Sequence, residues 1–436
     1  MYREIVKDLM KWRNSDKRKP LVITGMRQCG KTYVMQKFGK EAFESVVYIN
    51  LEKNELAASI FEYDYDVHRI VNELSGFSED GKIIPGKSLL IIDEIQACPR
   101  AITALKYFCE DMRELHVMCA GSLLGVALKH ENISFPVGKI NRLQMYPMSF
   151  KEYLIACDEE NIVKILNDYA KDRPLADSLM GRMEKLLKNY LLVGGMPEAV
   201  ASWCENRSFE EVAEIQDNIL EDYGSDFSKH APIADVPKLH WIWESVPKQL
   251  AKENNKFVFS QVKSGKRAHE LENALQWLVD SGLVYRCELA ANPEIPLSFS
   301  ADGSYFKIYM ADVGLLCRRT GLSYKALLAE NGVFSSFKGA LTENYVHNEL
   351  IYLDKKPYFW RSGNTAEVDF LIEDDENVIP VEVKSADNTR AKSYRLFCNR
   401  HKPSVGYKFS LKNTGVNMTE QTETYNIPLY MIWTLH

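Results

Sequence analysis

The chain has 436 residues, with 54 Lys and Arg against 60 Asp and Glu, and a net charge of −6. With 46% hydrophobic residues, its composition is that of a folded globular protein, which excludes a disordered or fibrous chain. The mild acidity excludes a protein that coats nucleic acid over its whole surface, so any such contact requires local basic patches. The length suggests about three domains.

The first residues carry charges throughout and lack the apolar segment of a secretory signal. No apolar run approaches the roughly 18 residues that a membrane-spanning helix needs. The nine cysteines are dispersed and form no C-x-x-C pair, which is typical of a reducing compartment and argues against a zinc site or a disulfide framework. These features predict a soluble cytoplasmic protein with no membrane partner.

The first candidate site lies at the start of the chain. A strand-like run, Leu21–Thr24, leads into a glycine loop, and an apolar-periodic helix follows. This order directs backbone N–H groups and a helix N-terminus at a phosphate chain. Lys31 is expected to contact the β- and γ-phosphates of ATP, which also gives it a catalytic role, and Thr32 to bind Mg²⁺. The residues expected to hold the nucleotide are Gly25, Met26, Arg27, Gln28, Cys29, Gly30, Lys31, Thr32 and Tyr33.

Two later strands end in residues that suit the same site. The apolar run 88–92 ends at Asp93 and Glu94, and ligands bind at the carboxyl ends of such strands. Asp93 is expected to hold Mg²⁺ and Glu94 to polarise the attacking water, which favours hydrolysis. The run 116–120 ends before Ser122, which is either a sensor of the γ-phosphate or part of a plain turn. Cys29 is interpreted as a tolerated loop residue rather than a redox switch.

The segments LVITGMRQCGKT, LLIIDEIQACPR, MCAGSLLG and MYPMSFKEYL, in this order, resemble the AAA+-type ATPases of bacteria and archaea that carry a C-terminal domain of unknown function. YLLVGGMPEAV and FKIYMADVGLL resemble later landmarks of that family. The resemblance implies an ATPase domain over residues 1–155 and a helical lid over 156–235. Many members have Gly-Arg where this chain has Gly138-Lys139, which leaves the arginine finger unassigned, with Arg27 and Arg142 as unranked substitutes.

Residues 236–310 predict a winged helix. Two helical stretches, 239–253 and 267–279, precede strand-like segments at 283–288 and 306–310, and the family resemblance implies the same fold. Lys263, Lys266 and Arg267 lie at the start of the second helix, where helix-turn-helix proteins meet the major groove. Phosphate contacts by these residues would give DNA affinity without sequence choice. A spacer domain with solvated cations is an equal alternative.

The last segment, 311–436, offers a second candidate site. Two strand-like runs flank the polar turn 374–377 and predict a hairpin in which Val378 lies opposite Glu373 and Glu382 lies opposite Asp369. Directly opposed side chains share a face, and Lys384 joins them because side chains alternate along a strand. Two carboxylates so close repel each other unless a cation lies between them.

Asp369, Glu382 and Lys384 resemble the core of the PD-(D/E)xK nucleases, and the helix that carries Glu343 matches its first acidic element. The resemblance implies a divalent metal held by Glu343, Asp369 and Glu382, with Lys384 positioning the attacking water. Residues 388–412 carry seven Lys or Arg and no acid, interleaved with aromatic residues, which suits a nucleic-acid track. A nuclease-like domain that binds without cleaving is an equal alternative.

The sequence thus predicts an α/β protein with a P-loop parallel-sheet ATPase domain, a helical lid, a winged helix and a C-terminal restriction-endonuclease-like α/β domain. The expected function is Mg²⁺-dependent ATP hydrolysis coupled to a DNA-binding C-terminal region, with DNA cleavage left open. The alternative is a signalling or scaffold ATP switch whose inactive nuclease-like domain binds protein partners. The state of assembly is left open.

Overall fold

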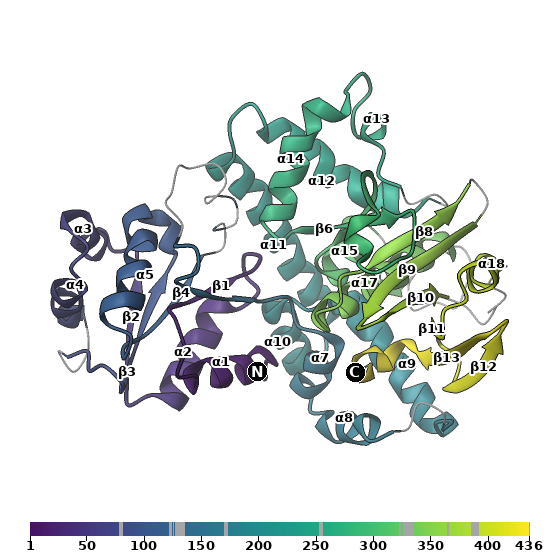
Figure 1. Cartoon of the computed structure of the whole chain (residues 1–436), viewed down its shortest axis with the longest axis horizontal. Helices are drawn as coiled ribbons and strands as arrows, with labels where there is room; N and C mark the ends of the chain where they lie inside the picture. Colours follow the sequence, from purple (N-terminus) through teal and green to yellow (C-terminus); the bar gives the residue numbers. More distant parts are fainter. Residues whose placement is uncertain are drawn as a thin grey trace. The chain divides into compact units, whose positions relative to one another are not determined.

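Two β-sheets organise the chain in this computed structural model (Figure 1). The structure describes residues 1–77, 82–121, 124, 126, 136–169, 173–252, 256–321, 324–325, 335–363, 366–384 and 392–435. The chain divides into two compact units, Met1–Pro147 with Asp280–Gly282, and Met148–Val279 with Leu283–His436. The first boundary lies close to residue 155, where the ATPase domain was predicted to end. The three later segments, predicted as separate domains, lie together in the second unit.

A parallel sheet forms the centre of the first unit, with strand order β2-β3-β4-β1-β5. Every residue of β3 and β4 is buried, as expected for central strands of a parallel sheet covered on both faces. The strands are β1 Leu21–Thr24, β2 Ser45–Asn50, β3 Ser88–Asp93, β4 His116–Ala120 and β5 Asn141–Gln144. The helices are α1 Ile5–Arg13, α2 Lys31–Ala42, α3 Glu55–Tyr63, α4 Val67–Leu74 and α5 Pro99–Asp111, with 3₁₀ turns η1 Ser75–Phe77 and η2 Ile95–Ala97. The predicted parallel-sheet P-loop fold is confirmed.

A mixed eight-stranded sheet forms the centre of the second unit, with strand order β12-β13-β11-β10-β9-β8-β6-β7. β11 pairs in parallel with β10 and β13, whereas β9 pairs antiparallel with β8 and β10. The strands are β6 Val284–Ala290, β7 Ala301–Met310, β8 Tyr358–Ser362, β9 Ala366–Asp374, β10 Asn377–Val383, β11 Val405–Ser410, β12 Gly415–Thr419 and β13 Thr422–Pro428. The predicted α/β character of the C-terminal region is confirmed.

Helices make up the rest of the second unit, and the predicted helical region up to residue 235 consists of α7 to α11. The helices are α7 Phe150–Ala156, α8 Glu160–Asn167, α9 Asp177–Val193, α10 Pro197–Asn206, α11 Phe209–His230, α12 Val236–Leu250, α13 Phe259–Val262, α14 Ala268–Asp280, α15 Val313–Arg319, α17 Ser335–Tyr352 and α18 Lys392–His401. The 3₁₀ turns are η3 Leu297–Phe299 and η5 Leu429–Thr434. Within the described ranges, no helix has the length and apolar character needed to cross a membrane.

The segment predicted as a winged helix contributes to the C-terminal sheet. Its two predicted helices occur as α12 and α14, and its two predicted strands lie within β6 and β7, which pair antiparallel. β6 also pairs with β8, where Leu289 lies opposite Phe359. The expected boundary at residue 310 therefore does not separate two sheets, because the edge of β8 that faces away from β9 binds β6.

Two of the family landmarks pack against each other in the second unit. The N–H of Gly195 donates to Oδ2 of Asp312 at 2.6 Å, and Oδ1 of Asp312 accepts from the N–H of Leu315 at 2.8 Å, which caps α15. Gly194 has φ +74°, and a Cβ there would lie 2.3 Å from Oδ1 of Asp312. A glycine is therefore required by both the backbone conformation and the close approach. These landmarks hold α9, α10 and α15 together.

The buried carboxyl of Glu349 predicts a pH-dependent stability. Oε1 of Glu349 on α17 accepts from the N–H of Phe150 at 2.9 Å, and burial raises the pKa of Glu349 from 4.5 to about 8. Between these pH values the folded chain binds the proton and the unfolded chain does not, so stability is full below about pH 4.5 and falls by roughly 1.4 kcal/mol per pH unit toward pH 8. Glu349→Gln keeps the acceptor and removes this slope.

Denaturant unfolding of wild type and Glu349→Gln between about pH 5 and pH 8 measures the effect. The stability gain of the variant over wild type should grow with pH. Glu160→Gln, which alters an exposed carboxyl on α8, is the control and should leave the slope unchanged. A gain that is the same at both ends of the range would contradict the assignment.

Candidate functional site

The glycine loop of the first unit connects β1 to α2 through three residues with positive φ, namely Gly25 (149°), Gln28 (62°) and Gly30 (95°). Gly30 precedes the first turn of α2. A Cβ on Gly25 would lie 2.2 Å from the carbonyl oxygen of Met145, so this position requires glycine. The predicted sequence of strand, loop and helix is confirmed, and it brings the loop to the N-terminus of a 12-residue helix, where the helix dipole favours an anion.

The side chain of Lys31 lies within the loop. Its Nζ donates to the carbonyl oxygens of Gly25 and Met26, both at 2.8 Å, and the residue is 7% exposed. The two carbonyls hold the ammonium close to the N-terminus of α2. A phosphate oxygen bound there would receive a charge-assisted hydrogen bond from an already positioned cation.

Thr32, at the start of α2, and Asp93, the last residue of β3, contact each other. The hydroxyl of Thr32 donates to Oδ2 of Asp93 at 2.6 Å. The hydroxyl of Tyr48, on β2, donates to the same oxygen at 2.9 Å. Burial, helped by the charge of Asp93, raises the pKa of Tyr48 to about 12, so its hydroxyl stays protonated and donates. Sequence reasoning missed Tyr48, although its place near the end of a strand beside β3 is a usable signal.

Glu94 follows Asp93 with a positive φ of 49°. Its N–H donates to Oδ1 of Asp93 at 3.0 Å, and Gln96 Nε2 donates to its Oε2 at 2.6 Å. Gln96 also lies against the end of β4, since a Cβ on Gly121 would lie 2.3 Å from Oε1 of Gln96. The amide of Gln96 therefore fixes the carboxylate of Glu94 next to the magnesium-binding candidate. Ser122 lies outside the described residues.

A buried arginine donates hydrogen bonds to the backbone of the glycine loop and of a neighbouring segment. Arg3, which precedes α1 and is 5% exposed, donates to the carbonyl oxygens of Cys29 at 2.8 Å and Tyr146 at 2.5 Å. Cys29 is fully buried, which agrees with a structural loop residue. Tyr33 is half exposed on the first turn of α2, where its hydroxyl accepts from the N-terminal amine. Sequence reasoning missed Arg3, because nothing local marks a terminal arginine as a loop contact.

The candidates for an arginine finger are dispersed in the first unit. Lys139 forms an ion pair with Glu110 at 2.8 Å. Arg142 is exposed on β5, opposite Val22 of β1. Arg27 lies in the phosphate loop itself and is partly buried. None of these positions is assigned to a finger.

The C-terminal hairpin has the predicted register. Val378 lies opposite Glu373 and Val381 opposite Phe370, which continues toward Glu382 opposite Asp369. The turn is one step tighter than predicted, since Asn377 already pairs with Asp374. Asp369 accepts from the N–H of Val383 at 2.7 Å, so the two strands remain joined at the candidate site.

The hairpin carboxylates lie beside a lysine that sequence reasoning missed. Lys307, on β7 and only 1% exposed, contacts Oε1 of Glu343 at 2.8 Å and Oε1 of Glu367 at 2.7 Å. The hydroxyl of Tyr309 donates to the same oxygen of Glu343 at 2.5 Å. Lys384 contacts Oε1 of Glu382 at 2.5 Å. An ammonium group therefore already neutralises the acids at the centre of this cluster.

Burial and neighbouring charges shift the pKa values of the residues in this cluster. Burial raises the pKa of Asp369 well above its usual value, and the carboxylates of Glu382 and Glu343 raise it further. Burial also raises the pKa of Glu382, although Lys384 opposes the shift. Burial opposes the charge of Lys307, but Glu343, Glu367 and Asp369 outweigh it and raise the pKa of that lysine. A cluster with these shifts favours a bound cation or proton.

The predicted metal ligands are brought together only in part. Oε2 of Glu382 is buried and has no hydrogen-bond partner, whereas Glu343 is held by Lys307 and Tyr309. In the part of the chain that the structure describes, no group of three or more His, Cys, Asp and Glu side chains has the arrangement of a metal site. Asp369, Glu382 and Lys384 nevertheless gather around one end of the hairpin.

The basic residues proposed for DNA contact differ in their surroundings. Lys263 and Arg267 are exposed before and at the start of α14, and Lys263 lies 5.2 Å from the ring centre of Trp241. Lys266 forms an ion pair with Glu270 at 2.6 Å, which offsets its charge. Lys263 and Arg267 are therefore stronger candidates for phosphate contacts than Lys266.

The aromatic residues of the basic stretch 388–412 are placed differently from the prediction. Tyr394, Phe397 and Phe409 are at most 1% exposed and lie in the core, so the prediction that aromatic residues take part in a nucleic-acid track is wrong for these three. The spacing of 394 and 397 along α18 puts both side chains on its buried face. The exposed charges of this helix include Arg395 and Arg400. Residues 385–391 lie outside the described ranges.

Three segments of the chain match known family models. Residues 17–154 match an AAA domain family. Residues 184–326 match a domain of unknown function (DUF8612), and residues 338–431 match another domain of unknown function (DUF4143). A comparison with curated proteins gave no match. The match over residues 17–154 agrees with the resemblance to AAA+-type ATPases seen in the sequence of the first unit.

Solved structures with overall likeness include a Walker-type ATPase of Pyrococcus abyssi, the ORC2 protein of Aeropyrum pernix in ADPNP-ADP complexes, and AMPPCP-bound DnaA from Aquifex aeolicus. Their identities to this chain are 15%, 12% and 15%. The matches cover 73%, 77% and 62% of this chain and 95%, 92% and 74% of the others, with TM-scores of 0.45, 0.36 and 0.26. At these TM-scores no conclusion about this chain follows from them.

Replacing Lys307 should strongly lower the stability of the fold. Lys307→Met removes the buried ammonium and leaves Glu343 and Glu367 without their cation, which should lower the free energy of unfolding by about 3–5 kcal/mol. Adding Glu343→Gln should recover part of that loss, because it removes one unpaired charge. Denaturant unfolding measures both. Lys356→Met, which removes an exposed lysine 3.9 Å from Glu288, is the control and should cost under about 1 kcal/mol. Equal stability of the two lysine variants would contradict the assignment.

Proposed function

We propose that the first unit binds Mg²⁺-ATP in the glycine loop and hydrolyses it. One observation carries the proposal, namely the hydrogen bond of 2.6 Å from the hydroxyl of Thr32, on α2, to Asp93, at the end of β3. It joins the helix that follows the phosphate loop to the strand that ends in two acids. The AAA domain match over residues 17–154 supports the same activity.

Each residue has a defined role in this proposal. The loop N–H groups and Lys31 bind the phosphates, and Lys31 exchanges its two carbonyl contacts for phosphate oxygens as charge builds up there. Glu94, held by Gln96 through a hydrogen bond of 2.6 Å, accepts a hydrogen bond from the attacking water and orients it. Tyr48 keeps Asp93 in position.

The residues at this site fit a magnesium ion, since a hydroxyl and a carboxylate are both hard oxygen ligands. Thr32 and Asp93 would hold it, and their contact of 2.6 Å places the two oxygens on one side of the site. When bound, Mg²⁺ would neutralise charge on the phosphate oxygens.

We further propose that the second unit binds DNA, using the exposed cations Lys263 and Arg267 and the basic residues of α18. The chain as a whole is acidic, so attraction to phosphates depends on such local groups. The same proposal gives Asp369, Glu382 and Glu343 the role of holding a divalent cation for phosphodiester cleavage, with Lys384 orienting water. Burial opposes the charge of Lys384, yet Glu382 and Asp369 raise its pKa, so it acts as a cation and not as a base.

A specific observation favours a second candidate function for the C-terminal domain. The ammonium of Lys307 contacts Glu343 and Glu367 at 2.8 and 2.7 Å, which supplies positive charge without a metal ion. In that case the domain does not cleave, and the chain is an ATP-dependent switch whose second unit binds a protein partner. DNA binding and cleavage assays distinguish the two candidates.

ATP turnover should depend on Lys31. Lys31→Ala removes the cation at the phosphates and should lower the hydrolysis rate by about 10²–10³-fold, as expected for loss of one electrostatic contact in the transition state. Phosphate release from ATP in the presence of Mg²⁺ measures it. Lys37→Ala is the matched control, since Lys37 lies on the same helix in an exposed ion pair with Glu41, and it should turn over ATP normally. Full activity of Lys31→Ala would overturn the assignment.

DNA affinity should fall when the exposed cations of α14 are removed. In a gel-shift titration at several salt concentrations, the double variant Lys263→Ala/Arg267→Ala should bind duplex DNA more weakly and with a salt slope lower by about 1.8, since each lost phosphate contact removes about 0.9. Lys266→Ala is the control and should change binding less, because Glu270 already offsets its charge. Absence of binding at low salt would favour the protein-binding candidate.

The same mixtures with Mg²⁺ or Mn²⁺ test cleavage. Cleavage that disappears in Asp369→Asn would support the metal site. DNA binding without cleavage in wild type would indicate that Lys307, and not a metal ion, supplies the positive charge among these carboxylates. Cleavage that persists in Asp369→Asn would show that these carboxylates are not responsible.

A further inference from the structure

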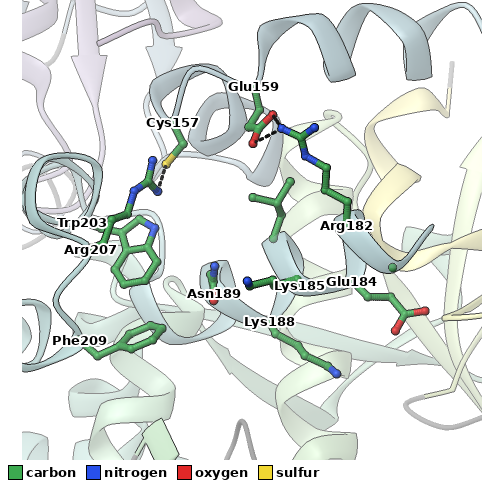
Figure 2. A pocket seen from close by; sticks show the side chains of 12 residues that line it. Cys157, Glu159, Arg182, Glu184, Lys185, Lys188, Asn189, Trp203, Arg207 and Phe209 are labelled. Carbon is green, nitrogen blue, oxygen red and sulfur yellow. Dashed lines mark hydrogen bonds and ion pairs between the residues drawn. The ribbon is translucent and has the colours of Figure 1, made fainter. Parts of the chain in front are cut away.

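A cavity of about 650 Å³ lies among α7, α9 and α10 of the second unit, apart from both candidate sites. Figure 2 shows Cys157, Arg207 and Trp203 on one side of it and the pair Glu159 and Arg182 on the other. Arg182 Nη2 contacts the two carboxylate oxygens of Glu159 at 2.9 and 2.6 Å. This cavity therefore has a formed polar wall opposite a cysteine.

The cysteine of the cavity belongs to a pair. Sγ of Cys157, at the end of α7, lies 3.0 Å from Sγ of Cys204 on α10. Cys204 is partly exposed, whereas the remaining seven cysteines of the chain are buried. Cys157 is 5% exposed and is one of the residues that line the cavity. The two sulfur atoms are thus adjacent, and one of the two residues lines the cavity.

An arginine activates the pair. Arg207 Nη1 donates to Sγ of Cys157 at 3.5 Å, and its guanidinium lies 5.6 Å from the ring centre of Trp203. The hydrogen bond with Cys204, together with that from Arg207, lowers the pKa of Cys157 to about 7, and the pKa of Cys204 is raised. Cys157 therefore carries the nucleophilic thiolate and Cys204 keeps its proton.

We propose that Cys157 and Cys204 form a reversible disulfide by exchange with a small disulfide of the glutathione type, which enters the cavity. The carboxylates of such a molecule suit a wall that also contains Lys185 and Lys188. The new bond links α7 to α10.

The exchange proceeds in two balanced steps. The Cys157 thiolate attacks one sulfur of the small disulfide, whose S–S bond breaks, and the first thiolate leaves with the electron pair and takes a proton from water. The sulfur of Cys204 then attacks that of Cys157, the bond between Cys157 and the small thiol breaks, and the second small thiolate leaves with the electron pair and takes up the proton that Cys204 loses. Two protein thiols are oxidised and one small disulfide is reduced to two thiols.

The test uses the full chain in glutathione buffers of increasing oxidised fraction, followed by alkylation and mass spectrometry of proteolytic peptides. We expect one crosslinked peptide pair, joining Cys157 to Cys204, that dithiothreitol releases. Cys204→Ser should instead accumulate a single glutathionyl group on Cys157, because the resolving thiol is gone. Complete alkylation of both cysteines in fully oxidised buffer would overturn the proposal.

A second measurement tests activation by Arg207. Arg207→Gln should slow the alkylation of Cys157 several-fold near neutral pH, whereas Lys164→Gln, which alters an exposed lysine that is paired with Glu160 on α8 and does not line the cavity, should not. Equal alkylation rates in wild type and Arg207→Gln would show that the arginine does not activate the thiol. Circular dichroism and thermal unfolding of each variant establish that it is folded.

Discussion

The meeting of Thr32 with Asp93 is the contact on which the account of the first unit depends. It exists because β1 and β3 run parallel with β4 between them, so that their carboxyl ends open on the same edge of the sheet. The glycine loop after β1 and the acids after β3 then face each other. Tyr48, Gln96 and Arg3 add hydrogen bonds to Asp93, Glu94 and the glycine loop, respectively. The ends of the parallel strands thus position the site, and the hydrogen bonds of these side chains stabilise it.

The C-terminal cluster is governed by a different constraint. Buried carboxylates require a counter-charge, and Lys307 supplies one from a strand that belongs to the predicted winged-helix segment. The pairing of β6 with β8 brings this strand close to the hairpin of β9 and β10. The segment predicted as a winged helix and the segment predicted as nuclease-like therefore share one sheet and the ion pairs of Lys307.

Local patterns predicted much of this fold. The glycine loop, the acids after β3 and the register of the hairpin follow from motif spacing and from the alternation of side chains along a strand. Lys307 could not be predicted in this way, because its partners lie 36 and 60 residues further along the chain and depend on long-range strand pairing. The burial of Tyr394 and Phe397 was accessible in principle, since their helical spacing indicates one buried face. The many basic residues around them favoured the prediction of a nucleic-acid surface instead.

The central claim is that the glycine loop, with Thr32 and Asp93, binds Mg²⁺ and a nucleoside triphosphate. Its most direct test is calorimetric titration of the full chain with a non-hydrolysable ATP analogue, with Mg²⁺ and with a chelator. The account predicts saturable binding that weakens when Mg²⁺ is removed and loses this dependence in Thr32→Ala. No heat of binding in folded wild-type protein, or the same affinity with and without Mg²⁺, would contradict it.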